Sequence, residues 1–505
     1  MTELGVIEYH GQPEHLKAFS ETVLPCGRII RNRFVKVAMY EHGAALLGGP
    51  PNAYHQALYR TWSTGHWGMC ITGNVQVSPT HLTLGRDLVV PDVLTASTVR
   101  PFKELADSVR SGCSETLAIL QLSHAGRQSP NLLGGRFPFA PPLAPSALRL
   151  GSGANSQASF VGRLLYHVLF QTPKEMTVVD IDYVVQQFTK GAEMAVEAGF
   201  DGIELHASHG YLLAQFISPK SNTRVDSYSA GKLALLHRLV SSIRETVPSD
   251  FVVGIKMNAA DYAIAGGAMD ADLPLQHFLE IGSWGLVDFI EISGGDYENP
   301  AFMGSIKPCS QRQALFSNFS SRAMNALSTL PPESQKTAPL VLLTGGLNTL
   351  SQCSSVLKNN YAHLLGIGRL SILCPDFPRR VSQLKACEGD YSSSEPTLDV
   401  PRPVAEFDEA SGTLDRVWRH VSKLVGFPKL IGAGMEMAWY IVMMRRVAAG
   451  QEVDATVGGV GAVMNMWFWR APSRLESRHA VIPIAALSVF LLVLAVVALL
   501  WRADS

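Results

Sequence analysis

The chain has 505 residues, which is enough for one large domain with additions or for two to three domains. Its 42 basic and 43 acidic side chains give a net charge of −1, so it lacks the basic excess that a nucleic-acid-binding surface requires. The seven cysteines are widely spaced and form no Cys-x-x-Cys pair, which argues against a zinc ribbon or an iron–sulfur cluster.

Short apolar runs, each followed by Gly, Pro or polar residues, recur along the chain. We expect eight strands, at Arg33–Tyr40, Gly68–Val75, Thr116–Ser123, Gly202–His206, Phe251–Asn258, Asp288–Ser293, Leu340–Thr344 and Leu364–Ile367. Helical patterns such as Ile181–Ala198 and Lys232–Thr246 lie between most of them. This alternation predicts an α/β fold with parallel strands, and eight units indicate a TIM (β/α)8 barrel. The competing doubly wound sheet would favour a G-x-G-x-x-G turn after the first strand, and none follows it.

Two regions interrupt the alternation. Residues Ala125–Thr172 are rich in Pro, Gly, Ala and Ser, and we expect a lid or wall over the C-terminal face of the barrel. After the barrel (1–384) we expect a linker and helical extension (385–479), with a helical pattern over Leu414–Ala449. The aromatic segment Met464–Trp469 suits a membrane interface, an ordinary helix packed on the barrel, or both.

The last part of the chain is apolar. Residues 480–501 form a run of 22 residues without a charge, flanked by Arg474 and Arg478 before it and Arg502 after it. At about 1.5 Å per residue a helix of this length spans roughly 30 Å, the thickness of a hydrocarbon core. We therefore expect one C-terminal transmembrane helix, a single-pass tail anchor that leaves the bulk of the chain facing the cytosol. A buried core helix is the alternative interpretation.

Polar residues gather where the predicted strands end, which in a barrel of this type is where function lies. Strand 4 runs directly into His206, His209 and Tyr211, three side chains that can donate a proton to a polar oxygen. Glycines that let a backbone approach an anion follow strands 7 and 8, and an arginine adds charge beside them: Gly345, Gly346, Gly368 and Arg369. The pair of loops predicts a phosphate site, although each Gly-Gly alone could be a tight turn.

These strand ends resemble the old yellow enzyme family of FMN-dependent NADPH oxidoreductases, in particular its fungal NADH:flavin oxidoreductase branch. The resemblance covers roughly residues 27–378 and rests on several motifs in the family's order. They are RNRFVKVAMYEHGA, WGMCITGNVQV, QLSHAGRQ, the block that begins at His206 and ends with Asn222 and Arg224, SGGDYE, LTGGLNT and GIGRL.

The resemblance implies an FMN site on the barrel. Gln121 would hydrogen-bond the flavin ring, and Lys256 would place a positive charge beside the flavin N1 and O2 atoms. Ala38, Met39, Tyr40 and Asn74 would line the flavin, while Gly345, Gly346, Gly368 and Arg369 would hold its phosphate. Many members carry Thr or Cys where this chain has Tyr40, and Arg is commoner than Lys at position 256.

The resemblance also implies a reaction. NADPH or NADH would reduce FMN, and His206 and His209 would then hold the carbonyl or nitro oxygen of an unsaturated substrate. Flavin N5 would give a hydride to the β-carbon, and Tyr211 would protonate the α-carbon. The protein would thus be an ene-reductase, an NAD(P)H:flavin oxidoreductase.

The same residues allow other interpretations. His206 and His209 could bind zinc, but no third ligand at an obvious spacing accompanies them. Tyr211 could be a packing tyrosine with a satisfied hydroxyl. The alternative functions are a flavin-dependent isomerase or dehydrogenase step in a biosynthetic pathway, and a catalytically idle membrane scaffold.

Overall fold

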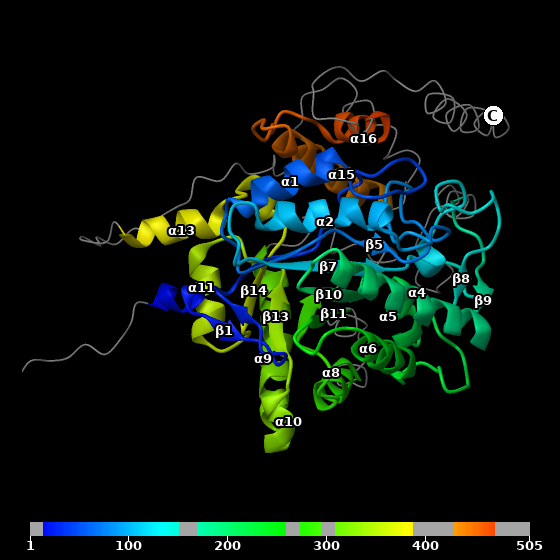
Figure 1. Ribbon diagram of the computed structural model, residues 1–505, viewed down its shortest axis with the longest axis horizontal. Helices are drawn as coiled ribbons and strands as arrows, with labels where there is room; N and C mark the ends of the chain where they lie inside the picture. Colours follow the sequence, from blue (N-terminus) through cyan, green and yellow to red (C-terminus); the bar gives the residue numbers. More distant parts are fainter. Residues whose placement is uncertain (1–13, 151–168, 259–272, 294–308, 387–428, 470–505) are drawn as a thin grey trace, which may run out of the picture.

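The computed structural model describes the chain except for residues 1–13, 151–168, 259–272, 294–308, 387–428 and 470–505. Its centre is a closed parallel barrel surrounded by helices (Figure 1). The barrel strands are β3 Phe34–Lys36, β4 Met69–Ile71, β7 Leu117–Ser123, β10 Gly202–Ala207, β11 Val252–Asn258, β12 Phe289–Ser293, β13 Leu340–Thr344 and β14 Leu364–Ile367.

Each barrel strand pairs in parallel with the next one along the chain, and β14 pairs with β3 to close the ring. The register sets Gln121 opposite Glu204 and His206 opposite Lys256. All eight expected strands are present in the expected order, so the TIM barrel prediction is confirmed. Closure of the ring excludes the doubly wound open sheet.

Alternate residues of the strands point into the barrel, and their character changes from one end to the other. Toward the N-terminal ends of the strands, the interior is filled by an apolar cluster that includes Val35, Met69, Ile119, Phe289 and Leu342, all fully buried. A side chain on Gly254 would collide with the ring of Phe289, so glycine is required there for the ring to fill the interior. The opposite side chains of each strand pack against the helices.

The helices that cover the strands begin at clear capping residues. Asn52, Thr95, Thr177 and Thr349 each accept a backbone N–H and form a capping box with the third helical residue. The helices are α1 Ala53–Ser63, α2 Ala96–Arg110, α4 Val178–Glu197, α5 Leu212–Ile217, α6 Ala234–Thr246, α8 Leu273–Ser283, α9 Cys309–Ser328, α10 Pro332–Lys336, α11 Leu350–Lys358, α12 Leu370–Leu373, α13 Phe377–Ala386, α15 Lys429–Ala448 and α16 Gly459–Phe468.

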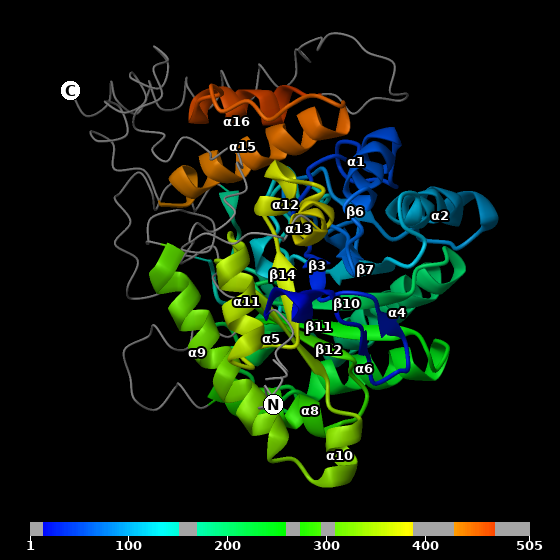
Figure 2. The same cartoon turned by 90° about the vertical axis from the view of Figure 1, so that its left-hand side faces the viewer.

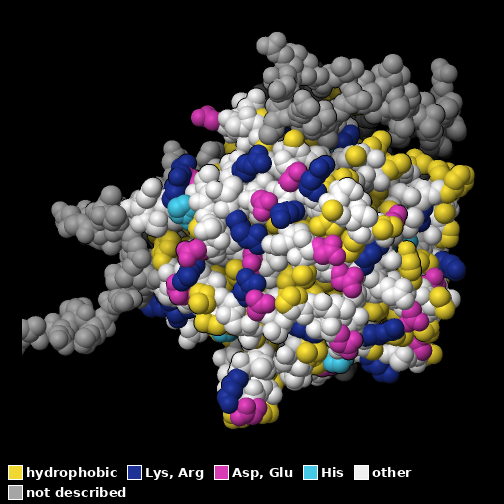
Figure 3. All heavy atoms as spheres, viewed as in Figure 1, with side chains coloured by type: hydrophobic (Ala, Val, Ile, Leu, Met, Phe, Trp, Pro, Cys, Tyr) yellow, Lys and Arg dark blue, Asp and Glu magenta, His cyan; other side chains and the backbone are white. Residues whose placement is uncertain are grey.

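Short elements complete the described fold. The 3-10 helices are η1 Glu14–Phe19 and η2 Gly126–Gln128. The short strands are β1 Thr22–Val23, β2 Ile29–Ile30, β5 Val75–Gln76, β6 Leu88–Val89, β8 Leu143–Ala144 and β9 Lys174–Glu175. Elements η2 and β8 belong to the described part of the predicted lid. On the face shown in Figure 3, basic and acidic side chains are interspersed, as expected from the balanced charge.

The C-terminal extension is helical where it is described. Helices α15 and α16 pack on each other and lie over α1 and α12 (Figure 2). Trp467 contacts the ring of His42 and Trp469 contacts the ring of Tyr54, so this aromatic segment packs on the barrel. None of the described helices is long and apolar enough to span a bilayer. The expected transmembrane segment, 480–501, lies outside the described residues.

Candidate active site

A polar layer lies above the apolar floor of the barrel. The Gln121 side-chain amide donates a hydrogen bond of 2.6 Å to Glu204 Oε2, and Lys256 Nζ lies 2.7 Å from Glu291 Oε1. All four side chains are buried. Burial, the charge of Glu291 and a hydrogen bond with it raise the pKa of Glu204 well above its usual value. Gln121 and Lys256 are therefore each held in place by an acidic partner inside the barrel.

The two histidines at the end of β10 are joined by a hydrogen bond. His206 Nε2 lies 3.3 Å from His209 Nδ1, and His209 Nε2 lies 3.0 Å from the hydroxyl of Ser293. His206 Nδ1 accepts from the backbone N–H of Ser208, which leaves the ring proton of His206 on Nε2. In the same way His209 Nδ1 is the acceptor, so its proton is on Nε2 and points to Ser293.

Both histidines are neutral at ordinary pH. Burial lowers the pKa of each well below its usual value, and the charge of Lys256 acts in the same direction. Protonation of His209 would further oppose protonation of His206. A neutral imidazole donates a hydrogen bond without giving up its proton, so this pair is suited to holding an oxygen atom. A proton for a reaction must come from another group.

Tyr211 lies beside this pair and could supply the proton. It is the N-cap of α5, and its buried ring lies 4.6 Å from that of His206, centroid to centroid, in an edge-to-face arrangement. The tight turn before it has a left-handed backbone at His209 (φ 56°) and Gly210 (φ 72°). Gln128 fixes this turn, because its side-chain amide donates to the His209 carbonyl at 2.8 Å. The structure therefore brings the three predicted catalytic residues together.

The loops that follow β3 and β4 lie side by side at the same end of the barrel. The Gly73 N–H donates to Glu41 and to Tyr59, and a side chain at Gly73 would collide with the Met39 carbonyl. These contacts bring Ala38 and Met39, which follow β3, next to Asn74. The buried Asn74 side-chain amide donates to Thr83 at 3.4 Å.

Tyr40 makes a contact that the sequence did not suggest. Its hydroxyl reaches Asp87 Oδ2 at 3.4 Å. Asp87 is buried and also accepts hydrogen bonds from Thr83 and Gln76. The large side chain of Tyr40 is thus tied to the network between β5 and β6.

The two glycine-rich loops predicted to hold phosphate are neighbours. Thr344, at the end of β13, pairs with Gly366 of β14. Gly345 (φ 115°) and Gly346 (φ 76°) have positive φ angles that favour glycine, while Gly368 has almost no neighbour in the direction of a side chain. Arg369 follows at the start of α12 and forms an ion pair with Glu436 of α15.

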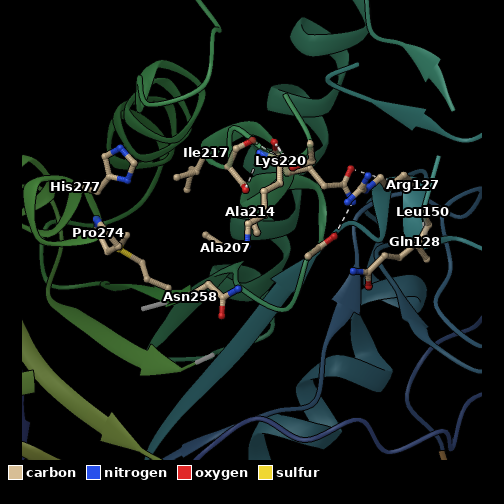
Figure 4. Close-up of a pocket in the computed structure, with 15 residues that line it drawn as sticks. Arg127, Gln128, Leu150, Ala207, Ala214, Ile217, Lys220, Asn258, Pro274 and His277 are labelled. Carbon is tan, nitrogen blue, oxygen red and sulfur yellow. Dashed lines mark hydrogen bonds between the residues drawn. The ribbon is translucent and has the colours of Figure 1, made fainter. Parts of the chain in front are cut away.

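A cavity opens beside the turn that contains Gly210 (Figure 4). Its volume is about 40 Å³, and its walls come from η2, β10, α5, β11 and α8. Gly210 and Asn258 line the cavity together with Ala207 and Met257, which belong to the outer face of their strands. This cavity therefore borders the histidine pair from outside the barrel wall.

Several residues of the site were missed in the sequence. Glu204 and Glu291 each interrupt an apolar strand, and a charge in a buried strand needs a partner, so this signal could have been used. Ser293 and Gln128 carry no such signal, because only the folded barrel brings them to His209. Within the described residues, no group of three or more His, Cys, Asp or Glu side chains could hold a metal ion.

Comparison with known sequences defines the class of the protein. The sequence profile of the NADH:flavin oxidoreductase / NADH oxidase family matches residues 27–388, which is most of the chain. The protein is therefore a flavin-dependent NAD(P)H oxidoreductase. It belongs to the NADH:flavin oxidoreductase / NADH oxidase family, the old yellow enzyme family, as its motifs had indicated.

Two similar fungal proteins are both named NADH-dependent flavin oxidoreductase iliE. The NADH-dependent flavin oxidoreductase iliE of Neonectria sp. (strain DH2) is 35% identical over 372 residues, which cover 70% of this chain and 46% of that protein. This chain thus spans about half the length of that relative. The iliE protein of Hypocrea jecorina (strain QM6a) is 31% identical over 397 residues, which cover 76% of this chain and 94% of that protein.

Solved structures agree on the fold. The old yellow enzyme homologue from Zymomonas mobilis matches with a TM-score of 0.56 at 19% identity, over 73% of this chain and 93% of that one. Morphinone reductase matches with a TM-score of 0.54 at 20% identity, over 72% of this chain and 89% of that one. At these identities the likeness establishes the barrel alone.

The residues at the barrel mouth fit a flavin mononucleotide. The positive φ angles at Gly345 and Gly346 allow close approach of an anionic group, and Arg369 supplies a cation beside them. Within the described residues, Ser123 Oγ and Thr344 Oγ1 are buried without a hydrogen-bond partner. Both hydroxyls lie at the C-terminal ends of barrel strands, where polar atoms of a flavin could form hydrogen bonds with them.

Proposed function

We propose that the protein is an FMN-dependent reductase of activated C=C bonds, with an unsaturated carbonyl or nitro compound as substrate and NADH or NADPH as reductant. The observation that carries the proposal is the neutral donor pair of His206 and His209, in register with Lys256 and close to Tyr211. Bound FMN would supply hydride exchange between the nicotinamide and the substrate.

The histidine pair would bind the substrate oxygen. The backbone of Ser208 holds His206 with its proton on Nε2, and that N–H currently points to His209. A substrate oxygen would replace His209 Nδ1 as the acceptor, and His209 would turn its own N–H to the same oxygen. Two such donors in a buried site draw electron density away from the conjugated double bond.

Gln121 and Lys256 would hold the polar edge of the flavin ring. Each is buried and already oriented by Glu204 or Glu291, so neither must reorganise when the ring binds. Ala38, Met39 and Asn74 would line the ring, with Tyr40 held aside by Asp87. The loops at Gly345 and Gly368, with Arg369, would hold the phosphate.

Tyr211→Phe separates proton delivery from flavin reduction. We expect flavin reduction by NADH to keep its rate, and reoxidation by an enone such as 2-cyclohexenone to slow by about 10²-fold or more, because the general acid is missing. Anaerobic stopped-flow absorbance measures both half-reactions. Tyr228→Phe is the matched control, since Tyr228 packs against Phe216 away from the histidines.

Two results would contradict the proposal. Unchanged enone reduction by the Tyr211→Phe variant would remove Tyr211 from the role of proton donor. A folded, colourless protein that cannot be loaded with FMN would exclude the function itself, because the polar layer and the glycine loops would then serve no cofactor.

We also propose that residues 480–501 anchor the protein in a membrane, with the barrel on the cytosolic side. The support is the charge-free run and its arginine flanks. Wild-type protein is expected to stay in the membrane pellet after an alkaline carbonate wash. Leu491→Arg with Leu494→Arg should release it, since each central arginine costs about 3 kcal/mol of insertion. Recovery of the wild type in the wash would contradict the anchor.

A further inference from the structure

The helical pair of α15 and α16 lies beyond the part of the chain that matches the family profile. It nevertheless packs against the barrel beside α1 and α12 (Figure 2). Helix α12 begins directly after Arg369, so the extension reaches the loop that would hold the FMN phosphate.

Two side chains of α15 hold Arg369. Glu436 forms an ion pair with Arg369 Nη1. The centre of the Arg369 guanidinium lies 5.6 Å from the centroid of the Tyr440 ring. The Glu436 side chain is only 7% exposed, whereas that of Arg369 is 40% exposed. The carboxylate thus fixes one corner of the guanidinium, and the aromatic ring covers it.

A second contact fastens the same extension to the loop after β3. Arg445 is buried and donates to the His42 carbonyl at 2.9 Å and to the Asn465 carbonyl at 2.9 Å. Its guanidinium also lies 4.1 Å from the centroid of the Trp469 ring. Because Arg445 joins α15, the end of α16 and the barrel, it keeps α15 from moving away from Arg369.

This arrangement matters because a free arginine side chain has about 2 kcal/mol of rotamer entropy to lose when it binds an anion. Glu436 and Tyr440 remove much of that freedom in advance. The ion pair uses one of the five N–H donors of the guanidinium, so donors remain for phosphate oxygens. Glu436 also carries a negative charge, and its repulsion of a phosphate opposes the benefit.

We propose that Glu436 and Tyr440 are positioning residues for Arg369, and that the C-terminal extension is thereby a working part of the cofactor site. Preorganisation of the guanidinium outweighs repulsion, because the buried carboxylate is neutralised by the arginine that it holds. The proposal rests on the proposed use of FMN. It predicts an effect specific to the phosphate end of the cofactor.

The test compares FMN with riboflavin, which has the same ring but no phosphate. Full-length protein freed of flavin is titrated with each, and quenching of flavin fluorescence gives the dissociation constants. Glu436→Ala is expected to weaken FMN binding about tenfold, the value of one charge-assisted hydrogen bond, and to leave riboflavin binding unchanged. Glu436→Gln, which keeps an acceptor oxygen, should lose less.

Two further variants sharpen the test. In an Arg369→Ala background, Glu436→Ala should have no further effect on FMN binding, because its partner is absent. Glu452→Ala, an exposed glutamate in the loop after α15, is the matched control and should bind both flavins as the wild type does. Thermal unfolding of each variant shows that the barrel is intact.

The outcomes are distinct. FMN binding by Glu436→Ala that is as tight as in the wild type, or tighter, would overturn the proposal in favour of simple competition with phosphate. An equal loss for riboflavin, or a loss that persists without Arg369, would also overturn it. Failure of the wild type to bind either flavin would instead refute the proposed function.

Discussion

Replacing both His206 and His209 by alanine is expected to slow enone reduction by about 10³-fold or more while the protein still binds flavin. Each histidine removed takes away one preorganised donor, and a single such donor contributes about 10²–10³ in rate. The flavin contacts assigned to Gln121, Lys256 and the glycine loops do not involve these rings. Steady-state turnover with an enone and the visible flavin spectrum are the two measurements.

The backbone at His209 calls for a particular control. Its φ of 56° is left-handed, and alanine at such a position costs about 1 kcal/mol. His66 has the same φ of 56° in an exposed turn far from the site, so His66→Ala carries the same backbone cost. Full activity in His66→Ala, with loss in the double variant, assigns the effect to the imidazoles. If the double variant were as active as His66→Ala, the imidazoles of His206 and His209 would have no role in catalysis.

Lys256→Met is expected to lower both the stability of the protein and the redox potential of the bound flavin. The substitution leaves Glu291 buried beside Glu204 without the cation that lies 2.7 Å away in the native protein. Breaking a buried pair in this way lowers the free energy of unfolding by about 3–5 kcal/mol. Loss of the charge beside the flavin should also lower the two-electron potential by about 30 mV or more, since 30 mV corresponds to about 1.4 kcal/mol.

Denaturant unfolding and spectroelectrochemistry measure these two effects of Lys256→Met. Lys256→Arg is the conservative variant, because it keeps the charge and offers a fork of donors to Glu291. It should retain most of the stability and most of the potential. A Lys256→Met protein with the wild-type flavin potential would show that this charge does not act on the ring.

The barrel was predictable from the sequence because its strands are local features. Strands buried on both faces read as continuous apolar runs, as at Leu340–Thr344, and capping threonines such as Thr177 mark where helices begin. The grouping of His206, His209 and Tyr211 was also predictable, since six consecutive positions at the end of one strand must lie near one another. The chain order of the strands then places Gly345 next to Gly368.

The partners of these residues could not be predicted, because they depend on contacts between distant segments. Ser293 reaches His209 only when β10, β11 and β12 pair side by side in the sheet. Glu436 follows Arg369 by 67 positions and lies on a helix whose pattern gives no hint of which face meets the barrel. The sequence of the aromatic segment that ends at Trp469 suits a membrane interface, and its packing on Tyr54 could not be predicted from it.

The left-handed turn at His209 has a consequence for how this protein could evolve or be engineered. Glycine would adopt that backbone without strain, and asparagine with little, so histidine is not the most stable choice at this position. Substitutions selected only for thermal tolerance would therefore tend to remove the ring that is meant to hold the substrate. At this residue, the side chain that would give the greatest stability is therefore not the one that the proposed activity requires.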